Sequence, residues 1–160
     1  MNVTPLNKFV FILAKLVPYW IVGLVVLSIG LVLSAVLYGI VPSGSLWLIY
    51  FFSCIYILTM SGFGLIISNY SATMQQAMFV MFFFLMVFIL MSGLFTPVRS
   101  MPDWAQAVTL FNPLKYFIEV MRLVYLKGSR FADMIPQFLA LCGFAAAFGV
   151  WAILSYRKSN

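Results

Sequence analysis

Four long stretches of this 160-residue chain contain no Asp, Glu, Lys or Arg. They cover residues 17–40, 46–67, 77–95 and 136–156. A hydrocarbon layer about 30 Å thick takes about 20 helical residues to cross. In that layer a backbone must satisfy its own hydrogen bonds, which an α-helix does. We therefore expect an all-α membrane protein with four transmembrane helices.

The overall composition excludes the other common classes of protein. The chain is 65% hydrophobic and only 8% charged, so it cannot give a soluble domain its charged surface. The formal charge is +6, but the basic residues form no run and no platform with aromatic residues that could bind nucleic acid. We therefore expect no nucleic-acid partner. Histidine is absent, and Cys54 and Cys142 lie in apolar runs without metal-ligand spacing. We expect no metal site, no bound cofactor and no catalytic residue in this chain.

The ends and faces of the apolar stretches support membrane insertion. Aromatic side chains suited to the water–lipid boundary stand near the ends, among them Trp20, Trp47, Tyr70, Trp151 and Tyr156. Small residues at several positions would let helices approach closely. These are Gly30 with Ser34, Gly62, and Gly143 with Ala147.

A charged segment separates the third stretch from the fourth. All three acids of the chain and five of its nine bases fall at residues 96–135. Ser100, three residues before Asp103, predicts an N-cap, with Pro102 in the first turn of a short helix through Leu110.

A second helix is predicted directly after the first. Asn112 can cap it, and Pro113 suits its first position. It would run to about Lys127, with Gly128 as a left-handed stop. The two helices form a hairpin over residues 97–128.

The charges of the second helix share one stripe. Lys115, Glu119 and Arg122 follow i, i+4, i+7 spacing, so we expect them to neutralise one another. Such a helix can enter the bilayer partway if its polar stripe faces protein, which makes a re-entrant hairpin. It can also lie flat at the interface as a cap. The residues alone leave both arrangements open.

Four spans place both termini on one side of the membrane. The basic residues near the termini favour a cytoplasmic location for that side; they are Lys8, Lys15, Arg157 and Lys158. The five bases of the hairpin segment favour a cytoplasmic location for the other side. Charge alone leaves the orientation open.

The C-terminal half of the chain contains the segment "MSGLFTPVRSMPDWAQAVTLFNPLKYFIEVMRLVYLKGS", followed by a terminal apolar span and a short basic tail. This combination closely resembles the permease subunits of type-2 ATP-binding-cassette exporters. The opening "NVTPLNKFVFILAKL" is similar to the cytoplasmic coupling segment of that family, and "ISNYSATMQQAM" to a cytoplasmic turn. Members usually have six spans, so the resemblance implies a C-terminal part of such a permease, or a misplaced start site. Lys115 and Leu123 depart from the family pattern.

The resemblance implies an organisation in three parts. Residues 1–16 would form the coupling segment, residues 17–156 the transmembrane permease domain, and residues 157–160 a cytoplasmic tail. Both termini would be cytoplasmic in the bacterial inner membrane, with the hairpin on the outer side. Contact with the ATPase would involve Val3, Thr4, Pro5, Leu6, Lys8 and Lys15. The outer gate would involve Pro97, Pro102, Trp104, Asn112, Pro113, Glu119, Arg122 and Gly128.

The source of energy follows from the residues themselves. The apolar spans hold no acid, base or histidine, so they offer no site for proton coupling. The chain has no Walker phosphate loop, so it cannot hydrolyse ATP. The resemblance implies cassette subunits that bind ATP and Mg²⁺, a second permease in a homodimer or heterodimer, and lipid as partners. The alternative is a membrane assembly or pore-forming protein without a motor; the substrate stays open.

Overall fold

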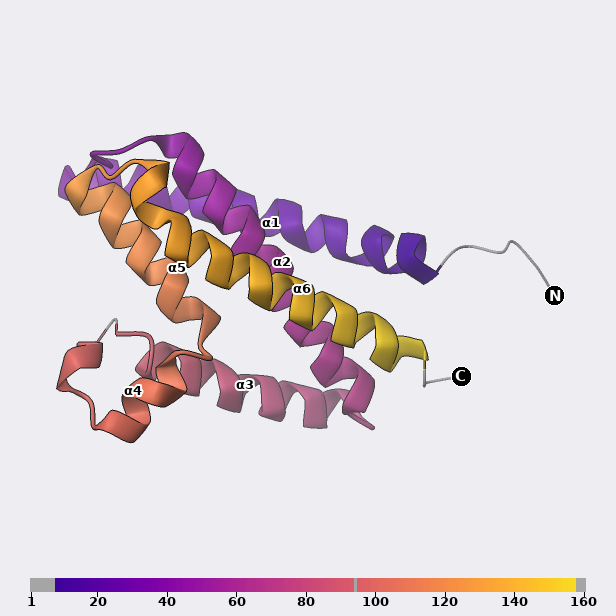
Figure 1. Cartoon of the computed structure of the whole chain (residues 1–160). Coiled ribbons are helices and arrows are strands. Elements are labelled where there is room, and N and C mark those ends of the chain that lie inside the picture. Colours follow the sequence, from indigo (N-terminus) through magenta and orange to yellow (C-terminus); the bar gives the residue numbers. More distant parts are fainter. Residues whose placement is uncertain (1–7, 94, 158–160) are drawn as a thin grey trace. The chain divides into compact units, whose positions relative to one another are not determined.

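The computed structural model describes residues 8–93 and 95–157, and every regular element there is a helix (Figure 1). The chain divides into two compact units, residues 1–41 and residues 42–160, which are described separately. The expected all-α class is confirmed for the described residues.

Among the described residues of the first unit there is one long helix, α1 (Lys8–Tyr38), of 31 residues. Its apolar part covers Val10–Tyr38, which is long enough to cross a membrane. The helix begins earlier than the predicted span at residue 17 and includes Pro18 in its interior. Residues 8–16 of the expected coupling segment therefore belong to the same helix as the span, and residues 1–7 lie outside the described residues.

The second unit holds the other apolar helices, α2 (Leu46–Tyr70), α3 (Met74–Leu90) and α6 (Ile135–Arg157). With α1, the apolar segments Leu46–Tyr70 and Phe131–Ser155 make three candidate spans among the described residues. Helix α3 has 17 residues and is shorter than the predicted 77–95, because the chain turns at Met91 and Gly93 has a φ of 86°. The expected number of four full spans is therefore not reached by helix length.

Helices α2 and α6 pack closely along their lengths. A Cβ atom on Gly62 would lie 3.2 Å from the backbone nitrogen of Gly149, so the two backbones nearly touch there. Gly62 thus acts as the sequence predicted, whereas Gly143 and Gly30 have no atom within 4 Å of an added Cβ. Near the start of α6, Phe51 and Phe52 of α2 surround Phe138, with ring centroids 5.7 and 6.2 Å away.

The charged segment forms the two predicted helices with two changes. Its elements are η1 (Val98–Ser100), α4 (Asp103–Thr109), α5 (Pro113–Arg122), the π-helical η2 (Leu123–Lys127) and η3 (Phe131–Met134). Helix α5 packs on α2, α3 and α6. Ser100 does not cap α4: its amide closes η1 on Pro97, and extended Pro102 precedes the helix. The second helix reaches Lys127 as predicted, but its last five residues are π-helical.

We predict that Gly62→Leu lowers the free energy of unfolding by about 1–3 kcal/mol, because its side chain must push the backbone of α6 away. Gly64→Leu, on the same helix, is the matched control, since an added Cβ there has no atom within 4 Å. Thermal unfolding of the purified protein in detergent measures both variants. Equal losses in the two variants would contradict the close crossing.

Candidate functional site

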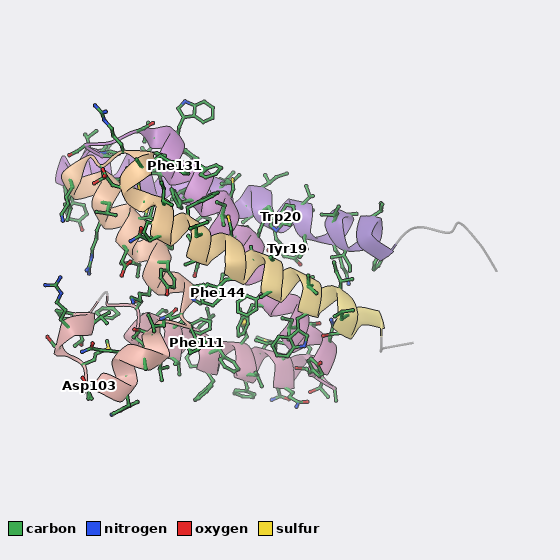
Figure 2. All side chains as sticks on the ribbon, in the orientation of Figure 1. Tyr19, Trp20, Asp103, Phe111, Phe131 and Phe144 are labelled. Carbon is green, nitrogen blue, oxygen red and sulfur yellow. The ribbon has the colours of Figure 1, made fainter. Side chains whose placement is uncertain are left out.

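Helix α5 lies against the first half of both α2 and α6 (Figure 1). The rings of Phe117 on α5 and Tyr56 on α2 are stacked, with centroids 4.7 Å apart. On the other flank, Tyr116 lies 5.9 Å from Phe144, which Figure 2 labels on α6. The start of α5 is therefore level with the middle of these two helices, and its end is level with their starts.

Asn112 joins the start of α5 to the end of α3. Its Oδ1 accepts from the amide of Leu114 at 3.0 Å, which is the predicted N-cap, and Pro113 takes the first helical position as predicted. Its Nδ2 donates to the carbonyl of Phe88 at 2.8 Å. That carbonyl lacks its usual helical donor, because the Ser92 amide bonds to Ile89 instead. The Asn112 side chain is 3% exposed, so both bonds are protected from water.

Arg122 makes a similar connection near the other end of α5. Its guanidinium donates to the carbonyl of Gly93 at 2.7 Å, in the turn that follows α3. Both ends of α5 are therefore fixed to the end of α3 by side-chain donors on backbone acceptors. The sequence pattern gave no indication of this bond, because Arg122 and Gly93 are 29 residues apart.

The turn before α2 caps the end of the hairpin. The amides of Gly44 and Ser43 donate to the carbonyls of Val124 and Tyr125, at 2.9 and 3.3 Å. Gly128 has a φ of 58°, which confirms the predicted left-handed stop. Its Cα lies close to Gly44, so side chains are excluded where the two turns meet.

The predicted ion-paired stripe is wrong. Glu119 accepts from Nε2 of Gln137, on α6, at 3.1 Å, and Arg122 uses Gly93. Lys115 places its Nζ 5.4 Å from the ring centroid of Tyr116. In the part of the chain that the structure describes, no ion pair joins the three charges. Contacts to other elements replace the pairing that helical spacing alone would favour.

A cavity of about 440 Å³ opens between the end of α5, the start of α6 and the segment before α4. Two leucines, Leu123 and Leu126, supply its apolar lining. The other lining residues are polar or charged: Arg99, Glu119, Arg122, Lys127 and Gln137. Three bases and one acid give the lining a formal charge of +2.

The structure brings together only part of the predicted gate set. Asn112 and Pro113 are buried, and Glu119 and Arg122 line the cavity. Pro97, Pro102 and Trp104 are exposed, and Asp103 lies on the α4 segment in Figure 2. Sequence reasoning missed Gln137, Arg99 and Lys127 as cavity residues. A polar residue two positions into α6 was the available signal for Gln137.

The expected contacts with an ATPase lie outside this site. Val3, Thr4, Pro5 and Leu6 lie outside the described residues. Lys8 begins α1, and Lys15 of the same helix places its Nζ 5.6 Å from the ring centroid of Phe11. Among the described residues, no cluster of three or more His, Cys, Asp or Glu could hold a metal ion.

Comparisons with known proteins give a consistent result. The family profile described as "ABC-2 type transporter" matches residues 2–126. The chain is 36% identical, over 98% of its length, to "Probable multidrug ABC transporter permease YbhR" of Escherichia coli K12, covering 42% of that protein. It is 30% identical, over 98% of its length, to "Inner membrane transport permease YhhJ" of the same strain, covering 42% of that protein.

A third relative is "Probable multidrug ABC transporter permease YbhS" of Escherichia coli K12, which is 28% identical over 91% of the chain and 39% of the relative. The chain thus spans about two fifths of the length of these relatives. No solved structure matches the chain.

We predict that Asn112→Ala lowers the free energy of unfolding by about 2–3 kcal/mol, because it removes a helix cap and leaves the Phe88 carbonyl without a donor. Asp103→Ala is the control, since Asp103 is exposed and opens α4 without a side-chain cap bond; we expect a loss below about 1 kcal/mol. Denaturation in detergent measures both. Similar losses would show that Asn112 does not tie α5 to α3.

Proposed function

The chain belongs to the ABC-2 type transporter family, and from that premise we propose that it is a membrane permease part of an ATP-driven exporter. It would form part of the translocation path and receive its energy from separate ATP-binding subunits. The observation that carries this proposal is the family match over residues 2–126 in a chain whose apolar spans have no titratable acid, base or histidine.

The spans argue for an external motor. A carrier driven by protons or sodium needs ionisable or coordinating groups near the middle of the bilayer. No acid, base or histidine occurs in the four apolar stretches, which are residues 17–40, 46–67, 77–95 and 136–156. The chain has no phosphate-binding loop either, so ATP and Mg²⁺ would be bound by partner cassette subunits.

We assign the contact with those partners to residues 1–16. Residues 8–16 are part of α1, which supports this role. A movement of the cassette subunit would be transmitted along the helix axis to the span, with no loop between them. Val3, Thr4, Pro5 and Leu6 would contact the cassette subunit directly, and Lys8 and Lys15 would face the cytoplasm. Both termini would then be cytoplasmic in a multi-pass protein of the inner membrane, and a second permease chain would complete the path.

We also propose that the hairpin is re-entrant and shapes the outer gate. Tyr56 lies ten residues after the start of α2, which is about 15 Å along the helix at 1.5 Å per residue. Phe144 lies nine residues after the start of α6, a similar depth. Because α5 contacts both residues near its start, a hairpin that extends toward the middle of the spans would account for these contacts. A helix lying flat across their ends would not reach these positions.

The names of the relatives suggest a class of cargo. Two of them are called multidrug permeases, and amphipathic organic molecules suit the aromatic and Met-rich surface of α3. Phe79, Phe82 and Phe83 are exposed on that helix. We therefore propose export of amphipathic compounds.

We predict that vesicles containing the full-length permease and its cassette partner export an amphipathic dye only when hydrolysable ATP is present. A pH or sodium gradient without nucleotide should give no transport above empty vesicles, since under this proposal the energy comes from the cassette partner and the spans of this chain hold no acid, base or histidine. A nonhydrolysable ATP analogue is the control. Gradient-driven transport without nucleotide would contradict the motor requirement.

We predict that nitroxide labels at Phe111→Cys and Ala132→Cys differ in membrane depth by about 10 Å or more, in a background with Cys54 and Cys142 changed to Ser. Phe111 is exposed beside the tip of the hairpin, and Ala132 is exposed just before α6. Accessibility to oxygen and to a polar nickel chelate measures depth in vesicles. Equal depths would favour a hairpin that lies flat at the interface.

A further inference from the structure

The cavity at the end of α5 has more positive charge than its own residues neutralise. Arg99, Arg122 and Lys127 line it, and Glu119 is the one acid among the lining residues. Glu119 is hydrogen-bonded to Gln137 rather than to a base. Within the described part of the chain, the Lys127 ammonium and the Arg99 guanidinium have no hydrogen-bond or ion-pair partner. Arg122 uses one nitrogen for the Gly93 carbonyl and keeps further N–H donors.

A second observation concerns Gln137. Its Nε2 donates to Glu119, but its Oε1 is buried and has no hydrogen-bond partner. A buried polar atom without a partner is a cost that native structures usually avoid. Glu119, which lines this side of the cavity, has a second carboxylate oxygen that can accept a hydrogen bond, and the basic side has spare donors. A ligand that carries an anion beside a hydroxyl or ammonium group would match both.

The position of the cavity indicates where the ligand comes from. Gln137 lies two residues from the start of α6, and Lys127 lies next to the turn that ends η2. Under the proposed membrane insertion, the starts of α2 and α6 lie near the head-group level, and the cavity beside the start of α6 lies near it too. Phosphate esters are the abundant anions at this level, and Leu123 with Leu126 offers an apolar surface for an acyl chain.

We infer that this cavity is a binding site for a phosphate ester whose head group also carries a hydrogen-bond donor, such as an anionic glycerophospholipid of the outer leaflet. The phosphate contacts Lys127 and the guanidinium groups of Arg99 and Arg122, whose forked donors suit phosphate oxygens. The donor of the head group lies toward Glu119. A bound lipid joins the end of α5, the start of α6 and the segment before α4. The inference rests on the proposed membrane insertion, but not on ATP-driven transport.

The test measures binding of phosphatidylglycerol to the full-length permease in phosphatidylcholine nanodiscs, titrated by native mass spectrometry. We expect saturable binding that falls roughly fivefold in Lys127→Gln, since one basic side chain near a membrane surface contributes about that much. Lys115→Gln is the matched control: it removes the same charge from the same hairpin helix, but Lys115 does not line the cavity. Binding to this variant should change less than twofold.

Glu119→Gln gives a prediction of opposite sign. It removes the single acid of the lining while its amide oxygen can still accept from Gln137. We expect phosphatidylglycerol to bind roughly fivefold more tightly. Because damage to the fold would weaken binding instead, a gain identifies an electrostatic site.

A second arm separates the two sources of phosphate. Glycerol 3-phosphate and inorganic phosphate are titrated against the protein in neutral detergent, with a thermal shift as readout. A Lys127-dependent shift at millimolar concentration identifies a site for soluble phosphate esters, and its absence together with lipid binding identifies a lipid site. Non-saturable binding, or equal losses in Lys127→Gln and Lys115→Gln, would overturn the inference. The binding measurements use no nucleotide. A negative result would therefore contradict the lipid site without contradicting ATP-driven export.

Discussion

A buried backbone carbonyl needs a hydrogen-bond donor, and the arrangement of the second unit depends on how that need is met. Wherever a helix ends, its last carbonyls have no partner within the helix. Helix α3 ends early, and the hairpin starts and stops beside it. Asn112 supplies a donor to Phe88, and Arg122 supplies one to Gly93. Backbone amides of the turn before α2 do the same for the end of the hairpin.

This constraint explains why polar residues interrupt an otherwise apolar chain. Their helical spacing suggests ion pairs within α5, but the unsatisfied carbonyls nearby are stronger competitors, since an orphaned buried acceptor costs about 1–3 kcal/mol. An exposed ion pair on one helix is worth only about 0.3–0.5 kcal/mol. Arg122 therefore bonds to a carbonyl and Glu119 to Gln137, which leaves the neighbouring bases of the cavity without an acidic partner.

The same contacts couple the hairpin to the spans. Helix α5 is tied to the end of α3 at both of its own ends, and η2, which continues it, is tied to the turn before α2 through the Gly44 and Ser43 amides. Ring contacts with Tyr56 and Phe144 hold its first turn between α2 and α6. A change in the spacing of these helices would therefore move α5 as a unit. Under the proposed gate role of the hairpin, that linkage would be a physical route from movement of the spans to the outer gate.

Local patterns in the sequence determined the elements of this protein. Charge-free runs indicated which segments are apolar helices, Asn112-Pro113 set the start of α5, and Gly128 set the end of η2, because caps and left-handed stops act within a few residues. Tertiary structure decided the partners. Two hydrogen bonds, from Arg122 to Gly93 and from Gln137 to Glu119, join residues 18 or more positions apart. The early end of α3 and the basic cavity depend on several elements at once. No spacing rule within one helix contains that information, since long-range contacts exist only after the helices have packed.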